Sequence, residues 1–156
     1  MPASSDFKEL LKNFNERQVK YLIVGAYAVM KYTEPRYTKD LDLWIEPTPE
    51  NAEQVFAALS QFGAPLNEVS VQDFTNPDLI FQIGIQPNRI DIIMSIKGVE
   101  FKDAWRRRVD ALFEEVPVPL ISKSDLLTAK RALARPQDLI DAERLQLSEE
   151  VEKRIK

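Results

Sequence analysis

Hydrophobic and polar residues recur along the chain with two different periods. Recurrence every three or four residues predicts helices over residues 6–17, 26–32, 49–62, 101–108, 123–133 and 136–145. β-Branched runs and strict alternation predict strands over residues 21–24, 40–45, 79–85, 89–96 and 112–121, with a hairpin turn at residues 86–88. Residues 64–77 fit neither period. This order of elements predicts an α+β or α/β domain with a mixed β-sheet flanked by helices.

Residues with special backbone preferences mark the ends of several elements. Gly25 closes a short strand and opens a helix, so we expect a glycine turn between them. Thr48 followed by Pro49 is typical of a helix start, and Gly63 suits the C-terminal cap of that helix. The two prolines within residues 112–121 predict that this strand lies at an edge or at the end of the sheet.

Length and composition indicate one domain over residues 1–156. A chain of 156 residues, 44% of them hydrophobic, can bury roughly two-thirds of its unfolded surface in one core. We expect the main body over about residues 18–121 and a short C-terminal helical segment over about residues 122–147. The most apolar stretch, residues 21–30, is too short to span a bilayer, and the first five residues lack the regions of a signal peptide. We therefore expect a cytoplasmic protein.

Two missing residue types limit the chemistry. The chain has no Cys and no His, which excludes thiol nucleophiles, disulfides, Ser-His triads and the usual zinc ligands. Any reaction must use carboxylates, Lys, Arg, Tyr or hydroxyl groups, and any bound metal must be a hard ion such as Mg²⁺ or Mn²⁺. The net charge of −4 also gives no general attraction to polyanions.

Three aspartates stand on predicted strands. Asp40 and Asp42 are two residues apart, so their carboxylates project from one face, about 6–7 Å apart along the backbone. For this pair alone, an acidic solvent-facing strand is the simpler explanation. Asp91 lies between apolar neighbours, where a lone buried carboxylate is costly. If the two strands are neighbours, three carboxylates converge on two divalent cations; otherwise Asp91 is exposed by alternation or paired with Arg89.

The order of these features resembles the polymerase-β-like nucleotidyltransferase superfamily, whose pattern is a glycine turn, a strand with two acids and a later strand with a third acid. Gly25-Ala26, Asp40-Leu41-Asp42 and Asp91 follow that order. Residues 24–29, 36–45 and 89–91 are more closely similar to small bacterial nucleotidyltransferases related to AbiEii-type toxins. Lys130 and the motif at residues 135–141 extend this resemblance over most of residues 20–145. It implies an α+β fold with a sheet of the nucleotidyltransferase type.

The resemblance also implies roles for individual residues. Asp40, Asp42 and Asp91 would be the catalytic acids and the ligands of two Mg (or Mn) ions. Nucleotide-binding positions would be Gly25, Ala26, Arg36, Lys39 and Lys130. Ala26 departs from the usual Gly or Ser, which keeps a backbone N–H for the phosphate and loses a hydroxyl. A solvated lysine explains Lys39 equally well, and an ordinary exposed cation is the alternative for Lys130.

The function that follows from the resemblance is transfer of a nucleoside monophosphate from a nucleoside triphosphate (NTP) to a hydroxyl on RNA or protein, with no membrane partner. The alternative is a catalytically inactive nucleotide-binding or interaction protein, such as one component of a toxin–antitoxin pair with a cognate antitoxin or toxin. Ala26 and the small size favour this alternative. Loss of transfer after Asp40→Asn or Asp91→Asn would distinguish an enzyme from a binding protein.

Several other charged and aromatic residues have simpler explanations. The basic run at residues 106–108 is more typical of a solvated helix face than of an RNA contact. Trp44 and Trp105 are expected to be packing residues, although Trp44 shares the acidic face of its strand. Asp138 and Asp141 are three residues apart on the last helix, so they share a face and could reach Lys130 or the site.

Overall fold

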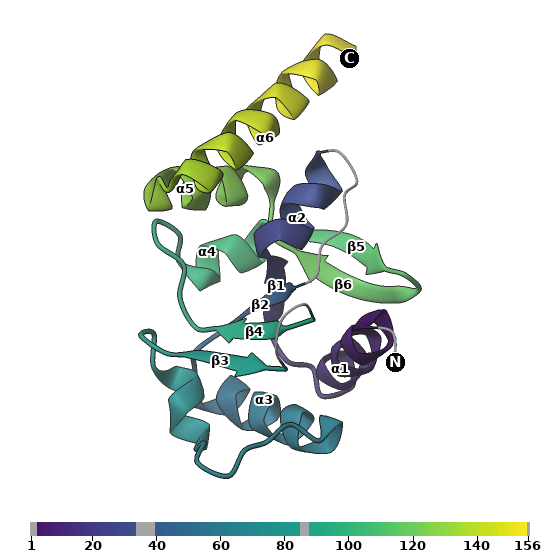
Figure 1. Ribbon diagram of the computed structural model, residues 1–156, viewed down its shortest axis with the longest axis vertical. Coiled ribbons are helices and arrows are strands. Elements are labelled where there is room, and N and C mark those ends of the chain that lie inside the picture. The colour runs from purple at the N-terminus through teal and green to yellow at the C-terminus, as the bar shows by residue number, and fades with distance from the viewer. Residues whose placement is uncertain (1–2, 34–39, 85–87, 156) are drawn as a thin grey trace.

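The computed structural model describes residues 3–33, 40–84 and 88–155 (Figure 1). The helices are α1 (Ala3–Glu16), α2 (Gly25–Tyr32), α3 (Pro49–Phe62), the 3₁₀ helix η1 (Val71–Thr75), α4 (Phe101–Arg106), α5 (Lys123–Leu133) and α6 (Pro136–Ile155). The strands are β1 (Tyr21–Val24), β2 (Leu41–Ile45), β3 (Ile80–Ile83), β4 (Ile90–Ile93), β5 (Val109–Phe113) and β6 (Val116–Leu120). None of these described helices is long and apolar enough to cross a membrane.

The six strands form one mixed sheet in the order β3-β4-β2-β1-β6-β5. β1 runs antiparallel to β2 and parallel to β6, whereas β2 and β4 run parallel. β3 and β4 pair antiparallel, as predicted, and most of the expected turn at residues 86–88 lies outside the described residues. The predicted α+β class with a mixed sheet flanked by helices is therefore confirmed.

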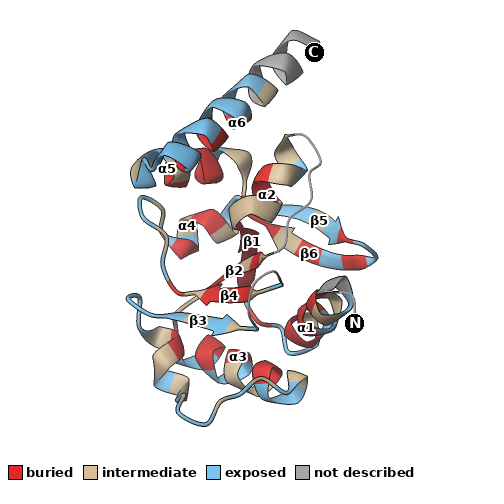
Figure 2. Ribbon diagram, in the orientation of Figure 1, coloured by how far each residue is buried: buried red, intermediate tan, exposed pale blue. Residues whose placement is uncertain are grey.

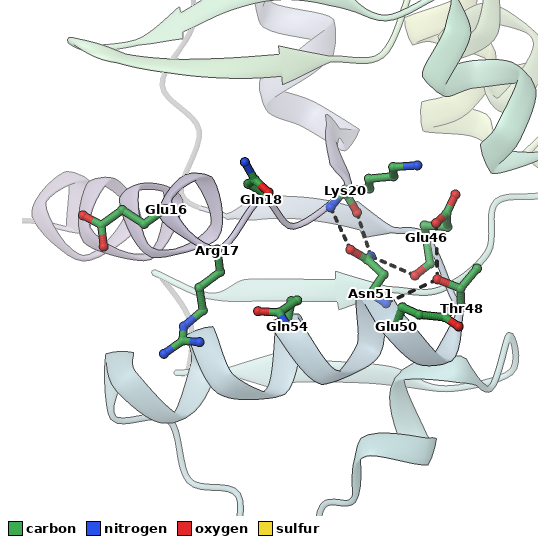
Figure 3. A pocket seen from close by; sticks show the side chains of 9 residues that line it. All are labelled: Glu16, Arg17, Gln18, Lys20, Glu46, Thr48, Glu50, Asn51 and Gln54. Carbon is green, nitrogen blue, oxygen red and sulfur yellow. Dashed lines mark hydrogen bonds between the residues drawn. The ribbon is translucent and has the colours of Figure 1, made fainter.

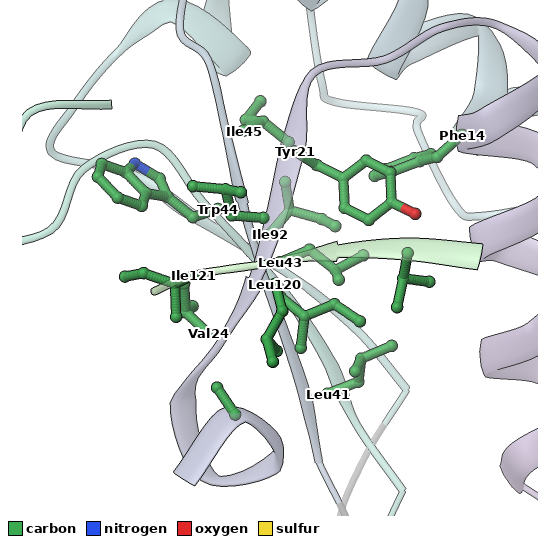
Figure 4. Close-up of a cluster of buried hydrophobic side chains, with 14 of the residues drawn as sticks. Phe14, Tyr21, Val24, Leu41, Leu43, Trp44, Ile45, Ile92, Leu120 and Ile121 are labelled. Atoms are coloured by element: carbon green, nitrogen blue, oxygen red, sulfur yellow. The ribbon is translucent and has the colours of Figure 1, made fainter. Parts of the chain in front are cut away.

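Alternation along the central strand β2 assigns a layer of helices to each face of the sheet. Leu41, Leu43 and Ile45 are fully buried on one face, and α1 joins this layer through the edge-to-face contact of Phe14 with Tyr21 (Figures 1 and 4). Asp42 and Trp44 lie on the other face, which α2 and α4 cover. The acidic residue therefore emerges on the face where α2 begins.

The core is centred on β1 and β2, whose residues are almost all buried (Figure 2). Four of the largest fully buried side chains are Trp44, Tyr21, Phe14 and Phe74. Burial decreases towards β3 and β5, the two edge strands, where nearly all residues are exposed or half-buried. The two acids Asp40 and Asp42 therefore lie at the start of a central, buried strand.

Local end signals behave as their chemistry predicts. The Thr48 hydroxyl accepts a hydrogen bond from the Asn51 N–H, and Gly63 ends α3 with a φ of 93°. Ser122 caps α5 in the same way, through the N–H of Asp125. These interactions are local in sequence, which explains why the ends of α3 and α5 could be predicted closely.

Four expectations need correction. Residues 112–121 do not form a single strand: β5 and β6 make a hairpin whose turn includes Glu114 at a φ of 55°. β6 is an interior strand, and its prolines are tolerated because the pairing with β1 involves only the end of β6, at Leu120. α1 begins at Ala3, before Asp6, and α6 continues to Ile155 because no Gly or Pro interrupts it after residue 145.

A polar groove lies at the end of β1 and β2 opposite the acidic motif (Figure 3). Its lining residues are Glu16, Arg17, Gln18, Lys20, Glu46, Thr48, Glu50, Asn51 and Gln54. The buried Asn51 amide accepts from the Lys20 N–H and donates to the carbonyls of Lys20 and Glu46. Asn51 thereby ties α3 to the ends of both central strands, and we assign the groove this structural role.

Candidate active site

Strand pairing brings two of the predicted acids side by side. In the register of the sheet, Asp42 on β2 is the direct partner of Asp91 on parallel β4. On its other side, Asp42 pairs with Val24, the last residue of β1 before the glycine turn. The glycine turn and two carboxylates therefore occupy one row across three neighbouring strands, on the face where α2 begins.

Gly25 leaves the space that the Asp42 carboxylate fills. A Cβ atom built on Gly25 would lie 1.9 Å from Asp42 Oδ2 and 2.8 Å from its Cγ. Gly25 also has a φ of 70°, a conformation that residues with a side chain rarely adopt. Glycine is thus required here for two independent reasons, and the turn packs directly on the acid.

Asp40 precedes β2 and is linked to the start of β4. Its Oδ1 accepts a hydrogen bond from the Arg89 backbone N–H at 3.2 Å, and the Leu41 N–H donates to the Arg89 carbonyl at 2.9 Å. Asp40 is half-buried. This pairing holds Asp40 at the same end of the sheet as Asp42 and Asp91. All three predicted acids therefore lie near one another at the end of β2 and β4 where these strands begin.

The Asp42 carboxylate is destabilised by its surroundings. Burial raises its pKa to about 6, and the negative charges of Asp91 and Asp40 act in the same direction. The positive charges of Lys130 and Arg89 lower the pKa of Asp42 and offset this effect in part. Added positive charge at this position would therefore stabilise the ionised form of Asp42.

Arg89 is bound directly to the acids. Its Nε donates to Asp91 Oδ1 at 2.8 Å, its Nη2 donates to Asp91 Oδ2 at 3.2 Å, and Nη2 lies 3.9 Å from Asp40 Oδ2. Arg89 immediately precedes β4 and is two residues before Asp91, so in extended backbone both side chains project from the same face. Asp91 is thus both paired with Arg89, as one expectation had it, and a direct neighbour of Asp42, as the other had it.

The donor chemistry of the three acids suits hard divalent cations such as Mg²⁺. The pairing of Asp42 with Asp91 on neighbouring parallel strands is the observation that favours a cation here, because it places two like charges side by side. Within the described residues, no group of three or more carboxylates is close enough to hold a metal ion as it stands. Asp91 directs both oxygens to Arg89, so a metal would require this pair to separate.

The first turn of α2 faces the same edge. Val24 precedes the helix and supplies no side-chain hydrogen bond to cap it. Backbone N–H groups at a helix N-terminus are suited to an anion such as a phosphate. Ala26 lies in this first turn, where only its backbone can contribute.

Lys130 joins α5 to α6 beside this edge of the sheet. Its Nζ lies 3.3 Å from both Asp138 Oδ1 and Asp141 Oδ2, and these two aspartates are almost fully buried. Arg135 also binds Asp138, and this hydrogen bond holds the pKa of Asp138 below its usual range. Lys130 is therefore a largely buried ion-pair bridge between α5 and α6, and its charge still acts on Asp42.

Lys130→Met is expected to lower the free energy of unfolding by about 2 kcal/mol, because it leaves buried carboxylates with fewer partners. The loss stays below that of an isolated buried charge, since Arg135 and Gln137 still contact Asp138 and Asp141. Urea denaturation measures it. The control is Arg131→Met, which removes an exposed cation of α5 that bonds Gln146 on α6 rather than either aspartate. A double variant, Lys130→Met with Asp141→Asn, should recover part of the lost stability. No recovery would contradict the bridging role of Lys130 between α5 and α6.

The remaining predicted positions divide into three groups. Arg36 and Lys39 lie outside the described residues. Arg106 pairs with Asp103, Arg107 pairs with Asp125, and Arg108 stacks 4.0 Å above the ring of Trp105. The basic run is thus engaged with the protein's own residues.

The two tryptophans are packing residues, as expected. Trp44 is 1% exposed and meets the Phe101 ring edge-on at 5.1 Å between centroids. Trp105 stacks on the same Phe101 ring, with 5.8 Å between the ring centroids. Trp44 shares the sheet face of Asp42, yet its burial removes it from contact with a ligand at the surface.

Sequence reasoning missed two features of this site. Arg89 entered only as an alternative partner of Asp91, although its spacing of two residues placed it on the acidic face from the start. The close approach of Gly25 to Asp42 had no sequence signal, because the two residues are joined only by the pairing of β1 with β2. Their contact depends on tertiary structure.

Comparison with known families gives one match that spans the chain. A family profile described as "Nucleotidyltransferase of unknown function (DUF6036)" matches residues 3–155. No curated protein matches the sequence at a significant level.

Several solved structures share the fold. The lincosamide antibiotic adenylyltransferase LnuA, with lincomycin bound, is 15% identical with a TM-score of 0.58, covering 91% of this chain and 95% of its own. ANT(2")-Ia in complex with adenylyl-2"-tobramycin is 18% identical with a TM-score of 0.59, covering 91% and 86%. A candidate nucleotidyltransferase from Thermotoga maritima is 13% identical with a TM-score of 0.53, covering 96% and 89%. At these identities the similarity concerns the fold.

Proposed function

The chain belongs to the DUF6036 family of nucleotidyltransferases, and on this premise we propose that it transfers a nucleoside monophosphate from an NTP to a hydroxyl group with the help of two Mg²⁺ or Mn²⁺ ions. The observation that carries the proposal is the row formed by the glycine turn, Asp42 and Asp91 across β1, β2 and β4. In a domain with only a structural role, nothing would require a carboxylate to fill the space beside a glycine that a side chain would otherwise occupy.

In this proposal each residue has a defined task. Asp40, Asp42 and Asp91 would hold the metal ions, which would supply positive charge to neutralise the triphosphate and the charge that develops during transfer. The N–H groups of Gly25 and Ala26 at the start of α2 donate hydrogen bonds to phosphate oxygens. Asp91 orients the acceptor hydroxyl and takes its proton as the oxygen bonds to the α-phosphorus and pyrophosphate leaves. Lys130 supports the site through its positive charge on Asp42.

Three acceptor classes are open to this chemistry. RNA and protein hydroxyls follow from the motifs. The dense basic run at residues 106–108 is exposed, but its arginines already contact Asp103, Asp125 and the ring of Trp105, so it does not favour RNA over protein. LnuA is a lincosamide antibiotic adenylyltransferase with lincomycin bound, which adds a small-molecule hydroxyl as a third class.

An inactive nucleotide-binding protein is the second candidate. Its support is Ala26, which offers the phosphate a backbone N–H and no hydroxyl. The relation to AbiEii-type toxins and a toxin–antitoxin partner belong to this candidate as well as to the enzyme, and both stay predictions from the motifs. The two candidates differ in whether bound NTP is consumed.

Nucleotide binding is the first test. The melting temperature of the full chain is measured with each NTP, with and without Mg²⁺, because a ligand that binds only the native state raises it. We expect Mg²⁺-dependent stabilisation by at least one NTP, absent in Asp42→Asn and retained in the control Arg107→Met, whose partner is Asp125. Stabilisation that is identical in Asp42→Asn would contradict the site, and binding with no release of pyrophosphate with any acceptor class would favour the inactive candidate.

A further inference from the structure

The side chain of Arg89 contacts two of the three acids that would hold a cation, Asp91 and Asp40. Its guanidinium donates to both oxygens of Asp91, and its Nη2 also approaches Asp40. The charge-assisted, two-point geometry is the strongest form of this interaction in proteins. The acids are therefore already supplied with one positive charge from the protein itself.

Lys130, the other described cation that acts on Asp42, does so from a distance. It is held between Asp138 and Asp141 and reaches Asp42 only through its field. The Arg89 side chain is 28% exposed, so solvent reaches it and it can move without opening the core. Arg89 is thus both a direct counter-charge of the acids and a part of the site that is able to move away.

We infer that Arg89 is a built-in counter-cation that competes with divalent metal ions for Asp91 and Asp40, so that metal entry requires Arg89 to release them. This inference rests on the proposed function, since it concerns the same metal ligands. A divalent ion alone must displace the guanidinium without giving it a new partner. When an NTP enters together with the metal, its phosphates can pair with the released guanidinium.

The consequence is a coupling between nucleotide and metal. Because the displaced Arg89 gains a partner only when the triphosphate is present, metal affinity should be low in the free protein and higher in the nucleotide complex. The same factor must apply to nucleotide affinity when metal is present. Arg89 therefore favours loading of metal and nucleotide together over loading of metal alone.

Direct titration with Mn²⁺ tests the inference without any measurement of transfer. The dissociation constant of Mn²⁺ is measured by calorimetry, and free Mn²⁺ by electron paramagnetic resonance, on the nucleotide-free full chain. Arg89→Met removes the competitor and should bind Mn²⁺ about tenfold more tightly than the wild type, the scale of a partly exposed hydrogen bond between charged groups. Arg107→Met removes an equivalent two-point arginine pair, with Asp125, and should leave Mn²⁺ binding unchanged.

The second measurement repeats the titration with a non-hydrolysable ATP analogue, or the analogue of whichever NTP stabilises the protein. In the wild type the analogue should tighten Mn²⁺ binding, and in Arg89→Met that tightening should be smaller. Circular dichroism checks the fold, and Arg89→Gln provides a second, polar variant if Arg89→Met does not fold.

The outcomes separate the inference from the proposed function. Unchanged or weaker Mn²⁺ binding in both Arg89 variants would overturn the inference and make Arg89 a positioning residue for Asp91, while the proposed function stands. Mn²⁺ binding that is undetectable in every variant, or equal in wild type and Asp42→Asn, would overturn the proposed function and the inference with it. Tighter binding with reduced nucleotide coupling would support the inference.

Discussion

Asp42→Asn is expected to abolish nucleotidyl transfer and to raise the free energy of unfolding at neutral pH in the same variant. Transfer should fall about a thousandfold or more, because an amide is a poor metal ligand and supplies no negative charge. Stability should rise by about 2 kcal/mol, since the raised pKa of Asp42 means that its ionised form opposes folding. Opposite changes in activity and stability are typical of a charged functional site.

The stability gain should depend on pH in a defined direction. The Asp42 carboxyl of the unfolded chain ionises near the ordinary aspartate pKa of 3.8, whereas burial raises the pKa of the folded one to about 6. Between these values the folded state binds one more proton, so the contribution of Asp42 to stability decreases as pH rises from about 4 to about 6. The difference between Asp42→Asn and wild type should therefore be small below about pH 4 and reach its full size above about pH 6.

Urea denaturation of both proteins across this pH range, together with pyrophosphate release at about pH 8, measures the prediction. Asp110→Asn, on the exposed edge strand β5, is the matched control and should change neither quantity. An Asp42→Asn variant that is less stable than wild type at neutral pH would mean that the carboxylate is structural. Full transfer by this variant would remove Asp42 from the site.

Gly25→Ala is expected to destabilise the protein by about 3 kcal/mol or more and to abolish transfer. The new Cβ would overlap the Asp42 carboxylate, which lies 1.9 Å away, so either the turn or the acid must move. The positive φ of Gly25 adds about 1–2 kcal/mol of backbone strain. The overlap and the backbone strain both arise at Gly25, where β1 is followed directly by α2.

A second glycine of the chain separates these two costs. Gly63 also has a positive φ, 93°, but no atom lies within 4 Å of the Cβ that would be added. Gly63→Ala should therefore cost only about 1–2 kcal/mol. Thermal and urea unfolding compare the two variants; an equal loss at both positions would mean that Gly25 has no close contact with Asp42.

A double variant locates the contact. Asp42→Ala removes the two atoms that would lie closest to the new Cβ, so Gly25→Ala should be less costly in an Asp42→Ala background. If the two single changes add without coupling, the predicted overlap is wrong. Together these variants test the packing of the glycine turn against the acid independently of catalysis.

Much of the fold could be predicted from the sequence because the deciding interactions are local. The strand at Tyr21–Val24 and the helices Lys123–Leu133 and Pro49–Phe62 follow from hydrophobic period, caps and a proline start. The hairpin at β5 and β6 was missed because its turn contains Glu114 at positive φ, without the Gly or Asn that usually marks such a turn.

The sequence by itself determined which residue types could do chemistry and the order in which they occur. It contains no His or Cys, so carboxylates, Lys, Arg, Tyr and hydroxyl groups were the candidates, and Asp40, Asp42 and Asp91 were the aspartates on predicted strands. It could not determine that Asp42 and Asp91 are partners, because their strands are separated by a helix, a long connection and another strand.

Only the tertiary structure decided the contacts that give these acids their properties. Strand order placed Gly25 beside Asp42, folded Arg89 over Asp91 and enclosed Lys130 between Asp138 and Asp141. The physical reason is range: periodicity and capping act within a few residues, whereas burial and charge interactions depend on distance in space, which strand pairing and helix packing establish.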